Sequence, residues 1–392
     1  MRINGILSLV VVVLLSTVIF ASAVNANVTR AGGIMQFRYN ARNTGDNVSI
    51  AQTSASTGQL NLSYANRGAV YSSPTVTNGI VYVGSYDHNV YALNATTGAK
   101  VWNYSTKSHV YSSPIVFNGI VYVGSDDHNV YALNAATGAK VWNYTLKGVV
   151  SYSWPAIANG IVYVGSYDNN VYALNATTGA KVWNYDTGSF VFYSPIVANG
   201  IVYVGSYNRN IYALNATTGA KVWNYTTLGP ILRRPAIANG IVYVGCDDHN
   251  VYALNATTGA KVWNYDTGNP VTSPTVANGI VYVGCDDHNV YAFNAATGEK
   301  VWNYTTKGVV WSAPGIANGI VYVGSYDNNV YALNATTGAK VWNYTIGDII
   351  YTTTAIGNGI VYVGTGAGVI YALNATTGAK VWNYDTGGSV FD

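Results

Sequence analysis

The amino-acid sequence predicts an all-β protein, an eight-bladed β-propeller of four-stranded antiparallel blades that follows an N-terminal signal sequence. The phrase Asn-Gly-Ile-Val-Tyr-Val-Gly occurs eight times, and the phrase Lys-Val-Trp-Asn-Tyr follows every copy. The eight tryptophans of the second phrase are spaced by 40, 41, 40, 40, 39, 40 and 40 residues. A period of this length with four strand patterns per unit is typical of propeller blades, whereas the coils of a β-solenoid are shorter.

The first 26 residues have the order of an export signal. Met1 and Arg2 precede an apolar stretch from Ile6 to Ala23, and small residues end the segment at Ala26. We interpret residues 1–26 as a signal peptide, residues 27–58 as a lead-in segment and residues 59–392 as the propeller. Because the apolar stretch of about 18 residues is close to the shortest membrane-spanning length, an uncleaved anchor stays the alternative for residues 1–26.

The first unit shows how each blade is expected to form. Its four strands are predicted at Ser73–Thr77, Ile80–Ser85, Asn89–Asn94 and Lys100–Tyr104. Asn78-Gly79 joins the first two strands, since both residue types tolerate positive φ in a tight hairpin. The second strand is apolar at successive positions, which indicates that neighbouring blades cover both of its faces.

Composition and charge exclude some classes of function. Charged residues are 9% of the chain and aromatic residues 13%, a balance that favours many short buried strands over disorder. The net charge of +3 is spread thinly, and the only adjacent basic pair of the mature part is Arg233-Arg234, so no nucleic-acid partner is expected. The two cysteines are too few for a disulfide framework, so stability is expected to come from packing and ring closure.

Three motifs carry a family resemblance. In the first unit they read Gly84-Ser85-Tyr86-Asp87, Tyr91-Ala92-Leu93 and Ala95-Thr96-Thr97-Gly98-Ala99-Lys100-Val101-Trp102, and the match recurs along the chain. The unit resembles the propeller repeat of the pyrroloquinoline-quinone (PQQ) type. The resemblance implies that each motif tryptophan docks against the adjacent blade. These tryptophans are Trp102, Trp142, Trp183, Trp223, Trp263, Trp302, Trp342 and Trp382.

The start of the chain is expected to meet its end. Met35–Asn47 is similar to the lead-in that often precedes this kind of propeller, and we expect it to dock onto the ring. Gln59–Tyr64 is a degraded copy of the fourth strand, so two strands compete for one place at the seam. Lys380–Tyr384 is expected to fill blade eight, with Gln59–Tyr64 either as an extra outer strand or as the closing strand that displaces it.

The resemblance points to two classes of relative. Quinoprotein dehydrogenases add to the propeller a Ca²⁺ site, an aspartate base and usually an adjacent pair of cysteines over the cofactor, whereas the BamB-type propeller of outer-membrane assembly is non-catalytic. In this chain Cys246 and Cys285 are 39 residues apart, and no long loop carries extra carboxylates. We therefore expect no catalytic residue, metal or cofactor, with PQQ and Ca²⁺ as the alternative.

A metal site built from repeated turns is a second chemical alternative. Cys246 and Cys285 replace the serine of the Gly-Ser turn in blades five and six, at equivalent outer positions that we expect to be too far apart for a disulfide. Histidine follows aspartate at one turn position in four units, as His88, His128, His249 and His288. Asparagine fills the same position in other units, so hairpin-turn chemistry is the simpler interpretation.

The copies differ mainly in the connection between units and at the start of the first strand. In a propeller these positions ring one mouth of the central channel, and loops on rigid scaffolds commonly carry recognition. Our candidate ligand-binding or partner-binding residues are Tyr71, Tyr111, Trp154, Phe192, Arg233, Arg234, Trp311 and Tyr351. The alternative is relaxed packing near the axis.

Fourteen Asn-x-Ser/Thr sequons make N-glycosylation of the outer rim a hypothesis. Six of them recur in the turn between the third and fourth strands, at Asn94, Asn175, Asn215, Asn255, Asn334 and Asn374. The alternative is that Asn-Ala-Thr-Thr-Gly is favourable turn chemistry, since Asn134 and Asn294 lose the sequon and keep the turn.

These features favour a non-catalytic, secreted or cell-surface propeller that binds a protein, peptide or carbohydrate at one mouth, in envelope organisation or adhesion. Two other functions stay open. One is a PQQ-dependent dehydrogenase or a cofactor-binding relative of one, and the other is a structural surface-coat protein that self-associates. Contact with a membrane is expected only through an uncleaved anchor.

Overall fold

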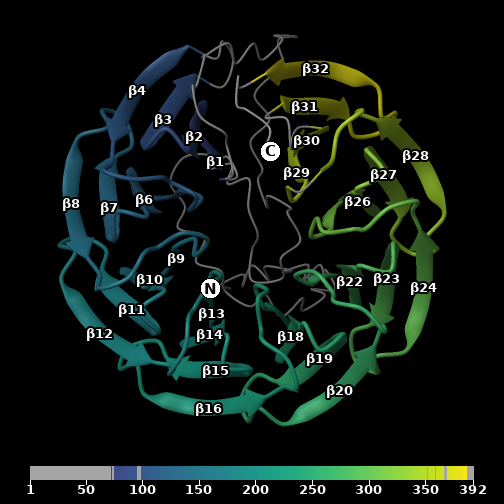
Figure 1. The fold of residues 1–392 in the computed structure, drawn as a ribbon, viewed down its shortest axis with the longest axis horizontal. Helices are drawn as coiled ribbons and strands as arrows, with labels where there is room; N and C mark the ends of the chain where they lie inside the picture. The colour runs from purple at the N-terminus through teal and green to yellow at the C-terminus, as the bar shows by residue number, and fades with distance from the viewer. Residues whose placement is uncertain are drawn as a thin grey trace, which may run out of the picture.

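The protein is a ring of eight β-sheets with four antiparallel strands each, which confirms the predicted all-β, eight-bladed propeller. The computed structural model describes residues 72, 75–94, 99–350, 352–357, 359–365 and 369–385. Figure 1 shows the sheets around a common axis, with the fourth strand of each sheet on the outer rim and the first strand toward the centre. The predicted signal sequence, the predicted lead-in segment and Gln59–Tyr64 lie outside the described residues. Within the described ranges, no helix is long and apolar enough to cross a membrane.

Each blade is a meander of four consecutive strands. The strands of blades one to four are β1 (Thr75–Thr77), β2 (Ile80–Gly84), β3 (Asn89–Asn94), β4 (Lys100–Ser105), β5 (Ile115–Phe117), β6 (Ile120–Gly124), β7 (Asn129–Asn134), β8 (Lys140–Thr145), β9 (Ala156–Ala158), β10 (Ile161–Gly165), β11 (Asn170–Asn175), β12 (Lys181–Asp186), β13 (Ile196–Ala198), β14 (Ile201–Gly205), β15 (Asn210–Asn215) and β16 (Lys221–Thr226). Those of blades five to eight are β17 (Ala236–Ala238), β18 (Ile241–Gly245), β19 (Asn250–Asn255), β20 (Lys261–Asp266), β21 (Thr275–Ala277), β22 (Ile280–Gly284), β23 (Asn289–Asn294), β24 (Lys300–Thr305), β25 (Gly315–Ala317), β26 (Ile320–Gly324), β27 (Asn329–Asn334), β28 (Lys340–Thr345), β29 (Ala355–Gly357), β30 (Ile360–Gly364), β31 (Val369–Asn374) and β32 (Lys380–Asp385).

The local chemistry of the repeat explains these strands. Asn78 and Gly79 have φ of 49° and 73°, as the predicted hairpin turn between β1 and β2 requires. In β2 all residues from Val81 to Gly84 are buried, because neighbouring blades cover both faces of the strand. The outer strand β4 instead alternates between exposed residues and the buried Trp102, as an edge strand with one covered face should.

The predicted strand ends need small corrections in blade one. The third strand is as predicted, whereas the second ends at Gly84 and the fourth extends to Ser105. The first strand is described from Thr75, and Ser73 and Pro74 lie outside the described residues. The amide of Ser85 donates to the carbonyl of Asn89 at 2.9 Å, so Ser85 closes the hairpin turn and does not continue the strand.

Neighbouring blades are joined by one recurring contact. Trp102 Nε1 and the Tyr82 hydroxyl of blade one both donate to the carbonyl of Ala135 in blade two, each at 2.9 Å. Gly138 of the same turn lies against the Trp102 ring, where a Cβ would come within 2.7 Å of a ring carbon. The tryptophan bond to the next blade recurs at Trp142, Trp183, Trp223, Trp263, Trp302 and Trp342. The side chain of Trp382 lies outside the described residues.

The last blade is built from the C-terminal part of the chain. β32 pairs with β31, with Ala372 opposite Trp382, and so occupies the outer position of blade eight. This is the place that the sequence assigns to Lys380–Tyr384, with one residue more at the end.

Candidate binding face

A short connector leads from the outer strand of each blade to the first strand of the next. Because the strands form a meander, the connectors lie at the same end of the blades as the turns between the second and third strands. The amide of Val110 in the first connector, for example, donates to the carbonyl of Ser85 in such a turn at 3.1 Å. We call the surface formed by the connectors and these turns the connector face. The remaining turns form the opposite face.

One buried aliphatic residue anchors each connector. Val110 is 1% exposed, and a Cβ on Gly84 would lie 2.5 Å from its Cγ1 and 2.7 Å from its carbonyl oxygen. The strand beneath must therefore end in glycine for the connector to approach this closely. Equivalent anchors, at most 2% exposed, are Val150, Val191, Ile231, Val271, Val310 and Ile350. The residues that follow an anchor consequently occupy defined places on the connector face.

Six of the eight predicted binding residues are described, and Tyr71 and Tyr351 lie outside the described residues. Trp311 is 50% exposed, while the other five, Tyr111, Trp154, Phe192, Arg233 and Arg234, are half-buried. The amide of Trp154 donates to Ser194 Oγ of the next connector at 3.0 Å, and the amide of Arg234 does the same with Ser273 Oγ at 3.0 Å. Trp154 and Arg234 therefore link neighbouring connectors, and the other four residues fall into two groups.

The first group is a run of aromatic rings over blades one to four. Tyr111 stacks on Tyr152 with ring centroids 5.3 Å apart, and Tyr152 stacks on Tyr193 at 6.4 Å. Phe192 packs against Tyr167 at 4.6 Å. We call this group the aromatic arc, and its members are Tyr86, His109, Tyr111, Tyr152, Tyr167, Phe190, Phe192, Tyr193 and Tyr207.

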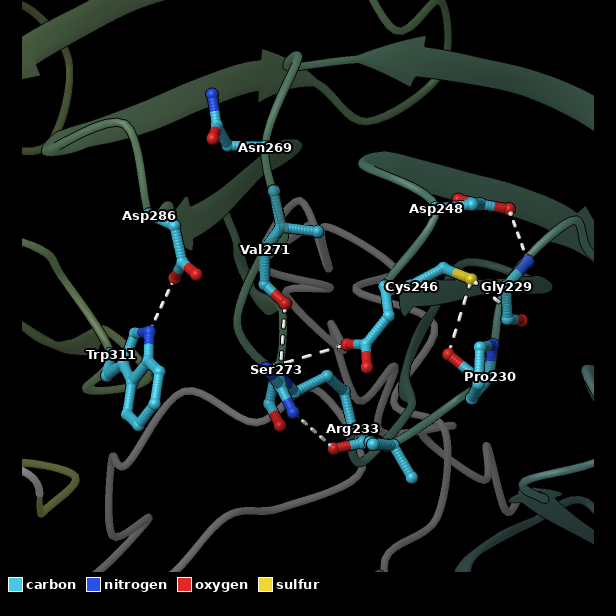
Figure 2. Close-up of polar contacts among 12 residues, drawn as sticks. Gly229, Pro230, Arg233, Cys246, Asp248, Asn269, Val271, Ser273, Asp286 and Trp311 are labelled. Carbon is cyan, nitrogen blue, oxygen red and sulfur yellow. Dashed lines mark hydrogen bonds and ion pairs between the residues drawn. The ribbon is translucent and has the colours of Figure 1, made fainter.

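The second group, which we call the charged arc, lies over blades five to seven and consists of Arg233, Asp247, Asp286 and Trp311. Figure 2 shows Arg233, Asp286 and Trp311. Arg233 Nε donates to the Val271 carbonyl at 3.1 Å, and its guanidinium lies 3.7 Å from Asp247 Oδ1. Trp311 Nε1 donates to Asp286 Oδ1 at 2.5 Å. This side of the connector face therefore satisfies most of its charge internally.

Successive aspartates in the turns of blades two and five differ in the direction of their pKa shifts. Burial acts to raise the pKa of Asp248, but hydrogen bonds from the Tyr252 hydroxyl and from the amides of Leu228 and Asn250, at 2.8 to 3.1 Å, outweigh it and leave the pKa below its usual value. Burial raises the pKa of Asp247, against the attraction of Arg233. The second aspartate thus belongs to the turn, whereas the first is a carboxylate on the connector face whose charge is poorly solvated.

The sequence led us to expect both cysteines at outer positions, but the structure places them in the interior. Both are free and fully buried, and Cys246 Sγ donates to the carbonyls of Gly229 at 3.2 Å and Pro230 at 3.5 Å beneath the connector (Figure 2). Ser125 makes the same kind of contact in blade two, to the carbonyls of Ser108 and His109. Burial raises the pKa of Cys246 to about 11 and that of Cys285 to about 12. These thiols are neutral and fasten the connectors.

The histidines at the repeated turn position have left-handed backbones. His88, His128, His249 and His288 have φ of 71° to 74°, and Asn169, Arg209 and Asn328 take the same position with φ of 68° to 75°. Among the residues that the structure describes, no three His, Cys, Asp or Glu side chains converge. The expectation that the chain binds neither PQQ nor Ca²⁺ stays a prediction.

Sequence reasoning missed several members of the aromatic arc. From the sequence we selected Trp154 in the second connector, yet Tyr152 is the residue that stacks between rings of the two flanking connectors. The sequence did carry a signal, because Trp142 and Trp183 are 41 residues apart where the usual spacing is 40, and the additional residue lies in this connector. Tyr86, Tyr167 and Tyr207 follow the Gly-Ser turn motif, where aspartate stands in blades two, five and six, so variation at this position was also visible.

The turn sequons lie on the opposite face. Asn175 Oδ1 accepts hydrogen bonds from the amides of Thr177 and Thr178, both at 2.9 Å, and Asn134, which is not in a sequon, accepts the equivalent bonds from Ala136 and Thr137 at 3.0 Å. The asparagine thus shapes the turn in both cases. Glycosylation at these positions stays a prediction.

The fold and the connector face together define a PQQ-type repeat propeller that presents unlike connectors on an otherwise uniform ring. The family model described as outer membrane protein assembly factor BamB matches residues 42–147, 107–192, 189–306 and 269–389. The chain belongs to this family, as the sequence motifs predicted.

Solved structures with the same fold have diverse functions. BamB from Moraxella catarrhalis is 21% identical, with a TM-score of 0.66 over 76% of this chain and 95% of that chain. The computationally designed Ika8 protein is 20% identical, with a TM-score of 0.68 over 82% and 98%. The quinohemoprotein alcohol dehydrogenase ADHIIG from Pseudomonas putida HK5 is 17% identical, with a TM-score of 0.66 over 84% and 75%. At these identities the likeness shows the fold alone. No curated protein matches the chain.

Proposed function

We propose that this protein is a non-catalytic, exported propeller that binds a partner protein through its connector face and serves as a scaffold in envelope organisation. The observation that carries the proposal is where the copies differ. Strands and interblade contacts are nearly identical from blade to blade, whereas the connectors carry different aromatic and charged residues. A family described as an outer-membrane assembly factor supports a protein partner and a location in the envelope.

The composition of the connector face also supports a protein partner. Tyr152, Phe190, Tyr207 and Trp311 are 41% to 50% exposed and lie on one side of a rigid ring. Tyrosine, tryptophan and arginine are the residue types enriched at the centres of protein interfaces, because they contribute large contact areas with few rotatable bonds. A peptide would use the same features, and a carbohydrate would use the aromatic rings.

Photo-crosslinking in the native envelope tests the proposal. A benzophenone amino acid would replace Tyr152 or Trp311 on the connector face and, as the matched control, the exposed Thr177 or Thr257 on the opposite face. We expect one envelope protein to be crosslinked from both connector positions and from neither control position. Crosslinking from the opposite face alone, or none from any position, would contradict the proposal.

Two further measurements separate the other functions from this one. Calorimetric titration of the mature protein with PQQ and Ca²⁺ should give no heat of binding; saturable one-to-one binding would favour the dehydrogenase-like function. Electron microscopy of the purified mature chain should show single rings; ordered arrays would favour a surface coat.

A further inference from the structure

Asp126 occupies the repeat position that Asp247 and Asp286 fill in blades five and six. Asp247 is paired with the guanidinium of Arg233 at 3.7 Å, and Asp286 accepts a hydrogen bond from the Trp311 indole. Asp126 accepts a bond from Ser151 Oγ at 2.5 Å. Arg233–Asp247 is the only ion pair among the described residues, so Asp126 has no cation within ion-pair distance in that part of the chain.

The surroundings of Asp126 are aromatic. Ser151 directly precedes Tyr152, so its hydrogen bond to Asp126 ties the carboxylate to the connector that carries Tyr152. Burial first, and the charge of Asp126 as a lesser cause, raise the pKa values of Tyr152 and Tyr167. Tyr152 is 41% exposed and stacks between Tyr111 and Tyr193. Burial likewise raises the pKa of Asp126, against the hydrogen bond from Ser151 and the attraction of His109 and His128. Asp126 is thus a half-buried carboxylate at the edge of the aromatic arc.

A planar organic cation suits this environment. A guanidinium forms two parallel hydrogen bonds with a carboxylate and stacks on aromatic rings, whereas an ammonium is a compact and more strongly hydrated charge. A cation near tyrosine faces gains further from the ring quadrupole when water is displaced. Blade five supplies an internal precedent, because there the chain places its own arginine against the equivalent aspartate.

We propose that Asp126, together with Tyr152 and Tyr167, forms a site on the connector face for an arginine side chain of the partner protein. The inference rests on the proposed function, because it identifies the chemistry by which the connector face recognises its partner. It predicts that one arginine of the partner is held between blades two and three.

Ligand-observed NMR titration of the mature protein with blocked Gly-Gly-Arg-Gly-Gly tests this site. The same peptide with citrulline, which has the shape of arginine and no charge, is the ligand control. The decisive variant is Asp126→Asn, and its charge-matched control is Asp327→Asn in a blade-seven turn, where Asn208 is the natural counterpart in blade four. Tyr152→Phe and Tyr152→Ser separate the ring from the hydroxyl and give a second test that keeps the carboxylate.

We expect binding of the arginine peptide in about the millimolar range, which is typical of so small a ligand. Asp126→Asn and Tyr152→Ser should each weaken it about tenfold or more. Asp327→Asn should leave it unchanged, and Tyr152→Phe, which keeps the ring, should weaken it less than Tyr152→Ser. Equal binding of the citrulline peptide, or equal affinity in Asp126→Asn and Asp327→Asn, would overturn the site. If free arginine bound as tightly as the peptide, this would overturn the inference that the bound arginine belongs to a protein. Arginine binding without any crosslinked partner would retain the site and refute the scaffold function.

Discussion

The contact that joins two blades and the connector that follows it are close in sequence, yet they differ in how much the copies vary. Trp223 donates to the Ala256 carbonyl of the next blade at 3.0 Å, and the same bond recurs from blade to blade. A few residues later come Arg233 and Arg234, whose counterparts in the next connector are Thr272 and Ser273. The ring can tolerate such changes because a single buried anchor per connector carries the packing. Under the proposed function, stability and recognition belong to different parts of one repeat.

Truncation of an interblade tryptophan should have the largest effect on stability. Trp223 is 7% exposed, so Trp223→Ala removes a buried ring and one of the two hydrogen bonds to the Ala256 carbonyl, the other being donated by the Tyr203 hydroxyl. We expect the free energy of unfolding to fall by about 3–5 kcal/mol in urea denaturation. The adjacent Val222 is 48% exposed, and Val222→Ala should cost about 0.5 kcal/mol or less. Equal costs at the two positions would show that the interblade contact is not what holds the ring.

A pair of glycines separates close packing from backbone strain. Gly259 and Gly240 have φ of 73° and 75°, but a Cβ on Gly259 would come within 2.7 Å of the Trp223 ring, whereas a Cβ on Gly240 meets nothing within 4 Å. Gly240→Ala should cost about 1 kcal/mol from strain alone, and Gly259→Ala about 2–4 kcal/mol. Thermal or urea unfolding of the two variants measures the difference. If Gly240→Ala were the more damaging change, the packing of this turn against the tryptophan would be wrongly assigned.

The two aspartates of blade five should respond to pH with opposite signs. The pKa of Asp248 lies below its usual value of 3.8, so its ionised form stabilises the fold above that value, and the contribution is lost as the pH falls through the folded pKa. Asp248→Asn should therefore cost about 1 kcal/mol at neutral pH and progressively less in acid.

The pKa of Asp247 is raised, so its ionisation costs stability as the pH rises from 3.8 through the folded pKa. The stability of the wild type relative to Asp247→Asn should decrease over that interval. Urea unfolding between pH 3 and pH 7 measures both variants, and parallel curves would refute the assignment of the two carboxylates to turn and connector face.

The smallest effects are expected at the cysteines. Burial raises the pKa of the Cys246 thiol to about 11, so a disulfide reagent at neutral pH should leave both cysteines unmodified until the protein is unfolded. Cys246→Ser should change the free energy of unfolding by about 0.5 kcal/mol or less, because serine makes the equivalent contact in blade two. Rapid labelling of the native protein would place the thiol at the surface and not beneath the connector.

The sequence predicted most of the fold because the repeat displays its local rules openly. Asn78-Gly79 requires a hairpin, the run from Ile80 to Val83 requires cover on both faces, and the tryptophan spacing sets the number of blades. The connector face was predicted only in outline. Stacking of Tyr152 on Tyr111, and pairing of Arg233 with Asp247, depend on how separate connectors and turns pack together. Neither the spacing nor the composition of one repeat reports these contacts.

The same limit explains the misplaced cysteines. From sequence, Cys246 follows the glycine that ends a strand, and a turn residue at that point is usually exposed. In the folded ring, the connector that leads into blade five passes over this turn, and its Gly229 carbonyl accepts a hydrogen bond from the Cys246 thiol. Cys246 is therefore buried because this connector covers it, which the sequence of the turn alone does not report.

One comparison of two variants tests the central claim most directly, namely that the connectors carry recognition and the uniform ring carries only stability. One variant replaces the exposed side chains of the connector face with serine at Tyr152, Phe190, Tyr207 and Trp311. The matched control replaces equally exposed outer-strand residues with serine at Val182, Val222, Val262 and Val301. Binding of the crosslinked envelope partner would be measured for both, after circular dichroism has shown that both are folded. We predict that the connector variant loses the partner and the control keeps it; retention by the connector variant, or loss by the control alone, would contradict the account.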